Sequence, residues 1–158
     1  MVRRKLANRK RLVAIVDDEK DITVLFRDAL QRIKGISIFA FTNPLMALEH
    51  FTINKEQYVL VISDLRMPSL NGLELVKKIK DLNPLSRTIL MTAFEIDDKL
   101  FQEYSKKEII NAFLQKPIRL DDLFVVVNNQ LHTYELQKNN RVDYNNKKFP
   151  ISSNRLAT

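Results

Sequence analysis

Five short runs of apolar residues alternate along the chain with longer segments in which apolar residues recur every three or four positions. The runs are rich in β-branched residues and cover 12–16, 36–41, 58–63, 87–93 and 108–114. Such runs are typical of strands that are buried on both faces. Their alternation with helical segments predicts an α/β domain, in which helices lie on both faces of a parallel sheet.

Residues typical of helix ends mark the segments between these runs. Asp21 lies at the expected start of the first helix, as its N-cap or as an acid of its first turn. The pair Asn43-Pro44 suits the start of the second helix, because proline is tolerated in a first turn. The third helix is expected after Gly72 and ends at Asn83-Pro84. Two further helices are expected over 95–107 and 121–137.

Asp64 stands where the third apolar run ends. Turn and breaker residues follow it in the pairs Met67-Pro68 and Asn71-Gly72, and the helical pattern begins only after them. This order places Asp64 at the carboxyl end of a buried strand, at the mouth of a loop. Ligands of open α/β sheets bind at that position.

Composition narrows the class of protein. A chain of 158 residues with 45% hydrophobic residues suits one domain with tails. It has no cysteine, which excludes disulfides, thiolate zinc sites and cysteine nucleophiles. It has no apolar run long enough to span a membrane, and its basic first residues lack the apolar core of a secretory signal. We therefore expect a cytoplasmic protein without membrane insertion.

The net charge of +7 is unevenly distributed. Residues 1–11 carry +6, residues 12–137 carry −3, and residues 138–158 carry +4. We therefore expect a basic flexible arm over 1–10, a mildly acidic folded domain over 11–137 and a basic polar tail over 138–158. Such ends are either solvated arms or segments that attract nucleic acid or an acidic partner.

Four of the predicted strands end in polar side chains. In a parallel sheet these ends lie along the same edge, which brings together Asp17, Asp18, Asp64, Thr92 and Lys116. Three carboxylates repel one another unless a cation joins them, and oxygen ligands suit Mg²⁺. With Mg²⁺ bound, Asp64 would be ionised and able to attack a phosphoryl group. The metal and Lys116 would then neutralise the transferring oxygens, and Thr92 could donate a hydrogen bond to one of them.

These residues stand in motifs that resemble those of the response-regulator receiver domain of two-component signalling. The motifs are Val16-Asp17-Asp18-Glu19, Ser63-Asp64-Leu65-Arg66-Met67-Pro68 with Gly72, Met91-Thr92-Ala93 and Lys116-Pro117. The resemblance covers roughly residues 10–132. It implies a three-layer, doubly wound, flavodoxin-like fold with a five-stranded parallel sheet in the order 2-1-3-4-5. It also implies that Asp64 accepts a phosphoryl group from a sensor histidine kinase in a phosphorelay.

The resemblance assigns roles to the metal site. Asp17, Asp18 and Asp64 would bind Mg²⁺ together with the backbone carbonyl of Arg66. A receiver of this kind assists its own phosphorylation and hydrolysis, but we do not expect it to be an enzyme that turns over a free substrate. The side chains of Arg66 and Phe94 occupy places where the family tunes the lifetime of the phosphoryl group.

The resemblance also assigns roles to the switch. Thr92 would be the switch hydroxyl, Lys116 the phosphate-contacting cation, and Phe113 the aromatic residue that is repositioned. Phosphorylation would alter the face formed by the fourth helix, the fifth strand and the fifth helix, and so change binding of a protein partner. Phe113 departs from a tyrosine in lacking a hydroxyl, and a purely structural role in the core is the alternative for it.

Two other functions stay open at this point. A phosphohydrolase of the haloacid-dehalogenase group needs a second acid two residues after its nucleophile, and Arg66 stands at that position. A receiver-like binding module that acts without phosphorylation is the second alternative. Magnesium-dependent phosphoryl labelling separates all three. No output domain is visible after residue 137, so we expect a stand-alone regulator or a fragment of a longer chain.

Overall fold

A parallel sheet of five strands forms the middle layer of the protein. The computed structural model describes residues 11–93 and 99–148. The strands, in the spatial order β2-β1-β3-β4-β5, are β1 (Arg11–Val16), β2 (Ile36–Phe41), β3 (Tyr58–Asp64), β4 (Arg87–Thr92) and β5 (Ala112–Gln115). This is the strand order of the predicted flavodoxin-like fold, which is thereby confirmed.

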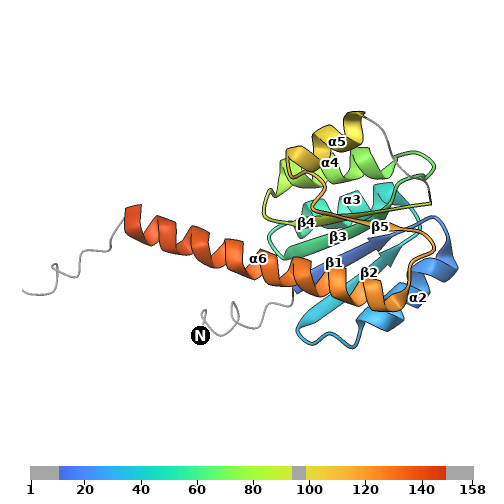
Figure 1. Cartoon of the computed structure of the whole chain (residues 1–158), viewed down its shortest axis with the longest axis horizontal. Coiled ribbons are helices and arrows are strands. Elements are labelled where there is room, and N and C mark those ends of the chain that lie inside the picture. The colour runs from blue at the N-terminus through green and yellow to red at the C-terminus, as the bar shows by residue number, and fades with distance from the viewer. Residues whose placement is uncertain (1–10, 94–98, 149–158) are drawn as a thin grey trace, which may run out of the picture.

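Helices cover both faces of the sheet (Figure 1). They are α2 (Lys20–Leu30), α3 (Pro44–Ile53), α4 (Gly72–Leu82), α5 (Lys99–Lys106) and α6 (Leu120–Lys148). One face is covered by α2 and α6, and the other by α3, α4 and α5. The fold therefore has the three layers expected from the alternation of strands and helices.

The central strands are buried on both faces, as their continuous apolar runs predict. Along β1, Val13 and Ile15 pack in the core beneath α2 and α6, together with Phe26 of α2. The intervening residues Ala14 and Val16 pack in the core on the other side of the sheet. The apolar side chains thus fill both faces of the strand along its length. The polar residue that follows the strand lies at the edge of the sheet.

The fifth strand starts later than predicted. Residues 108–111 lie in the turn between the end of α5 at Lys106 and the start of β5 at Ala112. The amide of Ile109 donates to the Tyr104 carbonyl, and the amide of Glu108 donates to the Ser105 carbonyl, at 2.8 and 3.2 Å. Glu108 has a φ of +58°. This is the Schellman arrangement that ends many helices, and the apolar run did not reveal it because glycine is absent.

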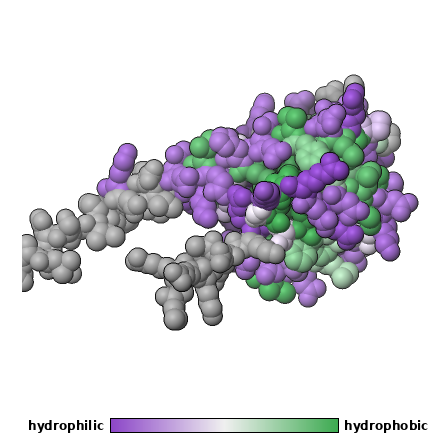
Figure 2. All heavy atoms as spheres, turned by 90° about the horizontal axis from the view of Figure 1, so that it is seen from below, coloured by the Kyte–Doolittle hydropathy of each residue, from purple (hydrophilic) through white to green (hydrophobic). Residues whose placement is uncertain are grey.

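The last helix is longer than predicted. It continues beyond Gln137 to Lys148, and it projects from the domain (Figure 1). No proline or glycine interrupts the sequence between Pro117 and Pro150, so nothing stops the helix at residue 137. Where Figure 2 colours the projecting part, its side chains are mostly hydrophilic, whereas hydrophobic side chains are seen on the domain.

Several expectations fall outside the described residues. They are the basic arm over 1–10, the start of the helix expected at 95, Phe94 and the last part of the tail. Within the described ranges, no helix is both long and apolar enough to cross a bilayer.

Candidate functional site

Polar side chains from four strand ends meet at one edge of the sheet. Asp64 is the last residue of β3, and Thr92 is the last residue of β4. Asp17 directly follows β1, and Lys116 directly follows β5. Because the paired strands are parallel, these carboxyl ends lie side by side. The structure thus brings together residues that lie up to 99 positions apart in the sequence.

Lys116 joins two of the acids. Its Nζ lies 2.9 Å from Asp17 Oδ2 and 3.3 Å from Asp64 Oδ1. Asp17 is fully buried, and its other oxygen, Oδ1, accepts a hydrogen bond from the Glu19 amide at 2.9 Å. The two oxygens of Asp17 are therefore both held, so this carboxylate has a fixed orientation.

Within the part of the chain that the structure describes, the contacts of Asp64 go to one of its oxygens. Its Oδ1 accepts a hydrogen bond from the Leu65 amide at 3.0 Å, in addition to the contact with Lys116. Among the described residues, no hydrogen bond or ion pair is formed by Asp64 Oδ2. The residue is 9% exposed, so this oxygen belongs to a nearly buried carboxylate at the mouth of the loop.

The three acids fit a divalent cation. Oxygens of Asp17, Asp18 and Asp64 lie within 4.8 Å of one another. Asp17 and Asp64 are buried, and Asp18 is exposed, so the cluster opens to solvent on one side. A hard cation such as Mg²⁺ takes carboxylate, carbonyl and water oxygens, and it usually keeps several waters. An open cluster of carboxylates provides this combination.

Electrostatics at the cluster favour a cation as well. Burial raises the pKa of Asp64, and the negative charge of Asp17 raises it further, whereas Lys116 opposes both effects. Burial lowers the pKa of Lys116, but its hydrogen bonds and the charges of Asp17 and Asp64 outweigh burial and raise that pKa. One lysine therefore only partly neutralises the carboxylates, and a divalent cation would favour their ionised forms.

Comparison with known proteins assigns the family. Residues 13–128 match the family described as the response regulator receiver domain. The chain belongs to this family. Receiver domains are phosphorylated by sensor histidine kinases in two-component systems, so this domain is that of a phosphorelay response regulator.

Two relatives illustrate the range of proteins that contain this domain. Sporulation initiation phosphotransferase F of Bacillus subtilis is 31% identical over 112 residues, which are 70% of this chain and 86% of that protein. The DNA-binding transcriptional regulator NtrC of Proteus hauseri is 31% identical over 126 residues, which are 80% of this chain but 26% of that protein. The chain thus spans about a quarter of NtrC.

Solved structures agree with this assignment. A response regulator receiver domain protein from Clostridium thermocellum superimposes with a TM-score of 0.69 at 26% identity. The match covers 80% of this chain and 98% of that one. The match to the family ends at residue 128, so the part of α6 from residue 129 to Lys148 lies beyond that match.

A tight turn positions the loop of this receiver domain beside Asp64. The Gly72 amide donates to the Leu65 carbonyl at 2.7 Å, and a Cβ atom at Gly72 would lie 2.2 Å from the Asp64 carbonyl oxygen. Between them, the Leu70 amide donates to the Pro68 carbonyl across Ser69, whose φ is +73°. This three-residue turn holds the loop close to the end of β3.

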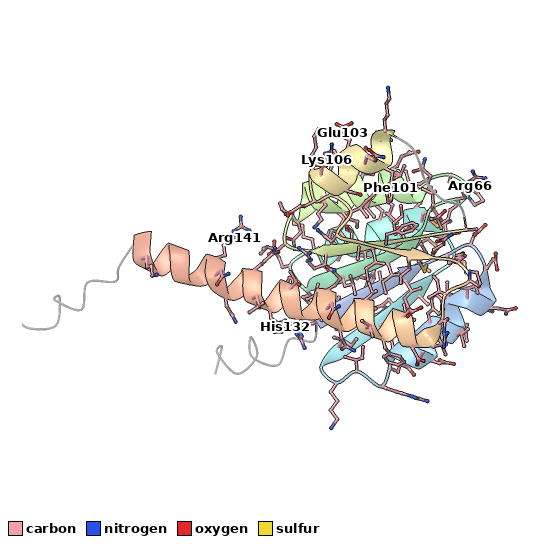
Figure 3. The ribbon with its side chains drawn as sticks, viewed as in Figure 1. Arg66, Phe101, Glu103, Lys106, His132 and Arg141 are labelled. Carbon is pink, nitrogen blue, oxygen red and sulfur yellow. The ribbon has the colours of Figure 1, made fainter. Side chains whose placement is uncertain are left out.

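The residues predicted to act as the switch lie on the two neighbouring strands. Thr92 is buried, and its carbonyl accepts a hydrogen bond from the Lys116 amide at 2.7 Å. Phe113, two strand positions before Gln115, is half-buried. Its ring packs edge-on against Phe101 of α5, which is labelled in Figure 3, with 5.4 Å between ring centroids. Phe113 is thus in contact with α5, the helix that follows Thr92.

Arg66 follows β3 in the loop, and its side chain is exposed at the rim of the site (Figure 3). The role of its carbonyl as a metal ligand stays a prediction. Sequence reasoning did not identify the amides of Glu19 and Leu65, which hold the two acids. Backbone donors leave no residue-type signal. Their position one or two residues after a strand-end acid is the one indication that the sequence gives.

Proposed function

We propose that Asp64 accepts a phosphoryl group from the phosphohistidine of a sensor histidine kinase, with Mg²⁺ as cofactor. The observation that carries the proposal is the position of Asp64. It is a nearly buried carboxylate, held by Lys116 at 3.3 Å and placed within 4.8 Å of two further acids. In the transfer, an Asp64 oxygen forms a bond to phosphorus as the bond from phosphorus to the histidine nitrogen breaks.

Each neighbour has a distinct task in this proposal. Asp17, Asp18 and Asp64 hold Mg²⁺ together with the Arg66 carbonyl, and the metal supplies charge neutralisation when bound. Asp64 Oδ2 is the attacking oxygen, because Oδ1 is engaged with Lys116 and an amide. Lys116 balances charge on the phosphoryl oxygens. The chain promotes its own phosphorylation and hydrolysis, but it does not turn over a free substrate.

A hollow beside the site suits the approach of the kinase. It has a volume of about 530 Å³ and is lined by Glu19, Ile22, Leu25, Phe26, Ala93, Lys116, Pro117 and Ile118. Leu25 is 48% exposed, which gives the hollow an apolar rim on α2. Apolar surface beside a charged centre suits a partner that brings both an apolar helix face and a phosphohistidine.

The output follows from Thr92 and Phe113. Once Asp64 is phosphorylated, the Thr92 hydroxyl donates to a phosphoryl oxygen and moves inward, and Phe113 changes position with it. Phe113 contacts α5 and lines a hollow of about 330 Å³ between β5 and α6. Its movement would alter the face formed by α5, β5 and α6, to which a downstream protein binds. Phosphorylation would thus add charge at one site and shift the balance between two arrangements of the packed residues.

The test is phosphoryl labelling by acetyl phosphate. We expect the full chain to become labelled in Mg²⁺ and to lose labelling in EDTA. Asp64→Asn should abolish labelling, and Asp81→Asn, an exposed acid on α4, should leave it unchanged. Persistent labelling of Asp64→Asn would contradict the proposal. No labelling of the wild-type chain by acetyl phosphate or a cognate kinase would favour a binding module that acts without phosphorylation.

A further inference from the structure

A second group of cations lies where β4 begins, at the opposite end of the parallel sheet from Asp64. Arg87 is the first residue of β4 and is 9% exposed. Its Nε donates to Gln130 Oε1 at 2.8 Å, and its Nη1 donates to Gln137 Oε1 at 3.1 Å. Both partners are neutral amides on α6. Within the described ranges, no carboxylate lies at salt-bridge distance from this buried guanidinium.

Lys80 of α4 lines the same cavity as Arg87, which has a volume of about 230 Å³. Its Nζ lies 3.5 Å from the Pro84 carbonyl, which is a long contact for an ammonium group. Burial lowers the pKa of Lys80 to about 8, with a further contribution from the charge of Arg87 and a partial offset by Glu108. Burial also lowers the pKa of Arg87. The two cations are therefore held close together at an energetic cost.

The cavity has more positive than negative charge. It is lined by Lys80, Pro84, Arg87, Lys107, Glu108, Ile109, Asn111 and Gln137. Lys107 is paired with Glu103 at 2.7 Å, so Glu108 is the acid that faces Lys80 and Arg87. A guanidinium has five N–H donors, and among the described residues the two bonds to glutamines leave three. A partly buried cavity with surplus charge and free donors favours an anion.

We propose that this cavity binds a small oxyanion of the phosphate class. The planar fork of Arg87 matches such oxygens with two parallel hydrogen bonds, and the ammonium of Lys80 adds a compact charge. The volume lies below the roughly 300–1,000 Å³ typical of cofactor and drug-sized ligands, which favours inorganic phosphate or pyrophosphate over a nucleotide. The bound anion would connect α4 and β4 to α6 through Arg87 and Gln137, at the region where α6 leaves the domain (Figure 1).

The experiment is a pyrophosphate titration of the ¹⁵N-labelled full chain in EDTA, followed by amide chemical shifts. Asp64→Asn serves as a second host, because the proposal does not depend on phosphorylation of Asp64. We expect saturable shifts confined to residues 80–87, 107–111 and 130–137 in both hosts. Lys80→Gln and Arg87→Gln should each weaken binding about tenfold or more, which matches the loss of one charge-assisted hydrogen bond.

Two control variants sharpen the test. Lys78→Gln removes an exposed lysine from the same helix and should leave the affinity unchanged. Glu108→Gln removes the acid that faces the two cations and should tighten binding. If Arg87→Gln does not fold, the affinity of Lys80→Gln tests the proposal instead. Lys80 is only half-buried, so its substitution should be tolerated by the fold. The proposal is overturned by unchanged affinity in Lys80→Gln, by shifts centred on Asp64 and Lys116, or by the absence of saturable binding.

Discussion

Lys116 is the residue on which the charge balance of the site depends. Its ammonium contacts the fully buried Asp17 and the nearly buried Asp64. We predict that Lys116→Met lowers the free energy of unfolding at pH 7 by about 2 kcal/mol, because it leaves two facing carboxylates without a cation. The loss should shrink as the pH falls and Asp64, whose pKa burial raises, becomes protonated. Urea unfolding at pH 7 and pH 4 measures both effects.

Magnesium supplies the control for this prediction. If the three acids hold Mg²⁺, saturating Mg²⁺ should restore part of the lost stability in Lys116→Met, because a ligand of the folded state stabilises it by mass action. The same addition should have no such effect in a variant that also carries Asp17→Asn and Asp18→Asn. Equal effects of Mg²⁺ on both variants would contradict the assignment of the metal site.

Removing the charge of Lys80 should stabilise the fold, whereas removing that of Lys116 should destabilise it. Its pKa is about 8 in the folded chain and 10.5 when unperturbed, so between these values the unfolded state binds more protons. The stability contributed by Lys80 therefore rises with pH across this window, and the buried charge is costly below it. Lys80→Met should be more stable than wild type at pH 7, by about 1 kcal/mol. The difference should narrow from pH 8 to pH 10, and the exposed Lys78→Met should show no such trend in urea unfolding.

The individual acids could be predicted from the sequence, because each stands directly after an apolar run. The sequence also predicted that they meet at one edge of the sheet, but not that Lys116 contacts Asp17 directly. The bridge from Lys116 to Asp17 depends on the spacing of two strands that are separated by β3 and β4 in the sheet. The cavity at Arg87 also escaped prediction, because a cation at the start of a strand is indistinguishable from an exposed one until α6 is placed over it.

Among the structural elements, the loop between β3 and α4 is the most constrained. Gly72 lies so close to the Asp64 carbonyl that a Cβ atom cannot be accommodated without movement of the backbone. We predict that Gly72→Ala destabilises the fold by about 1–3 kcal/mol and slows phosphorylation of Asp64. Thermal unfolding and the rate of labelling by acetyl phosphate measure these effects. Wild-type values for both would show that the loop relaxes without displacing Asp64.

Ser69 lies in the same loop, and replacing it by glycine should stabilise the fold, whereas Gly72→Ala should destabilise it. Its φ of +73° is unfavourable for a residue with a side chain but not for glycine. We predict that Ser69→Gly raises the free energy of unfolding by about 1 kcal/mol, because it removes this strain. A stability equal to or below that of wild type in chemical unfolding would show that the strain is offset by contacts of the serine side chain.

Predictions at the level of elements succeeded where a long apolar pattern decided them and failed at two boundaries. The parallel sheet with helices on both faces follows from the alternation of patterns, whereas the strand order was implied by the resemblance to receiver domains. The start of β5 was misplaced because Ile109 and Ile110 are apolar residues of a helix cap, which a pattern of hydrophobicity does not separate from a strand. The end of α6 was misplaced because a polar sequence without helix breakers has no signal at residue 137.

At the scale of the whole molecule, the projecting part of α6 is separable from the domain. Among the α6 side chains that the structure describes, Tyr134 is the last buried one, and Gln137 makes a hydrogen bond to Arg87. We predict that a chain ending at residue 137 has nearly the stability of the full chain, within about 1 kcal/mol, and the same rate of labelling at Asp64. Thermal unfolding and acetyl phosphate labelling test this. A large loss of either would place residues 138–148 within the folded domain.

The central claim is that Asp64, among three neighbouring acids, is the one that becomes phosphorylated. Reduction with borohydride identifies the residue directly, because it converts a phosphorylated aspartate to homoserine and leaves free carboxylates unchanged. After incubation with acetyl phosphate and Mg²⁺, reduction and mass-spectrometric sequencing, we predict homoserine at position 64. Homoserine at position 17 or 18, or its absence from a chain that carries the phosphoryl label, would contradict the assignment.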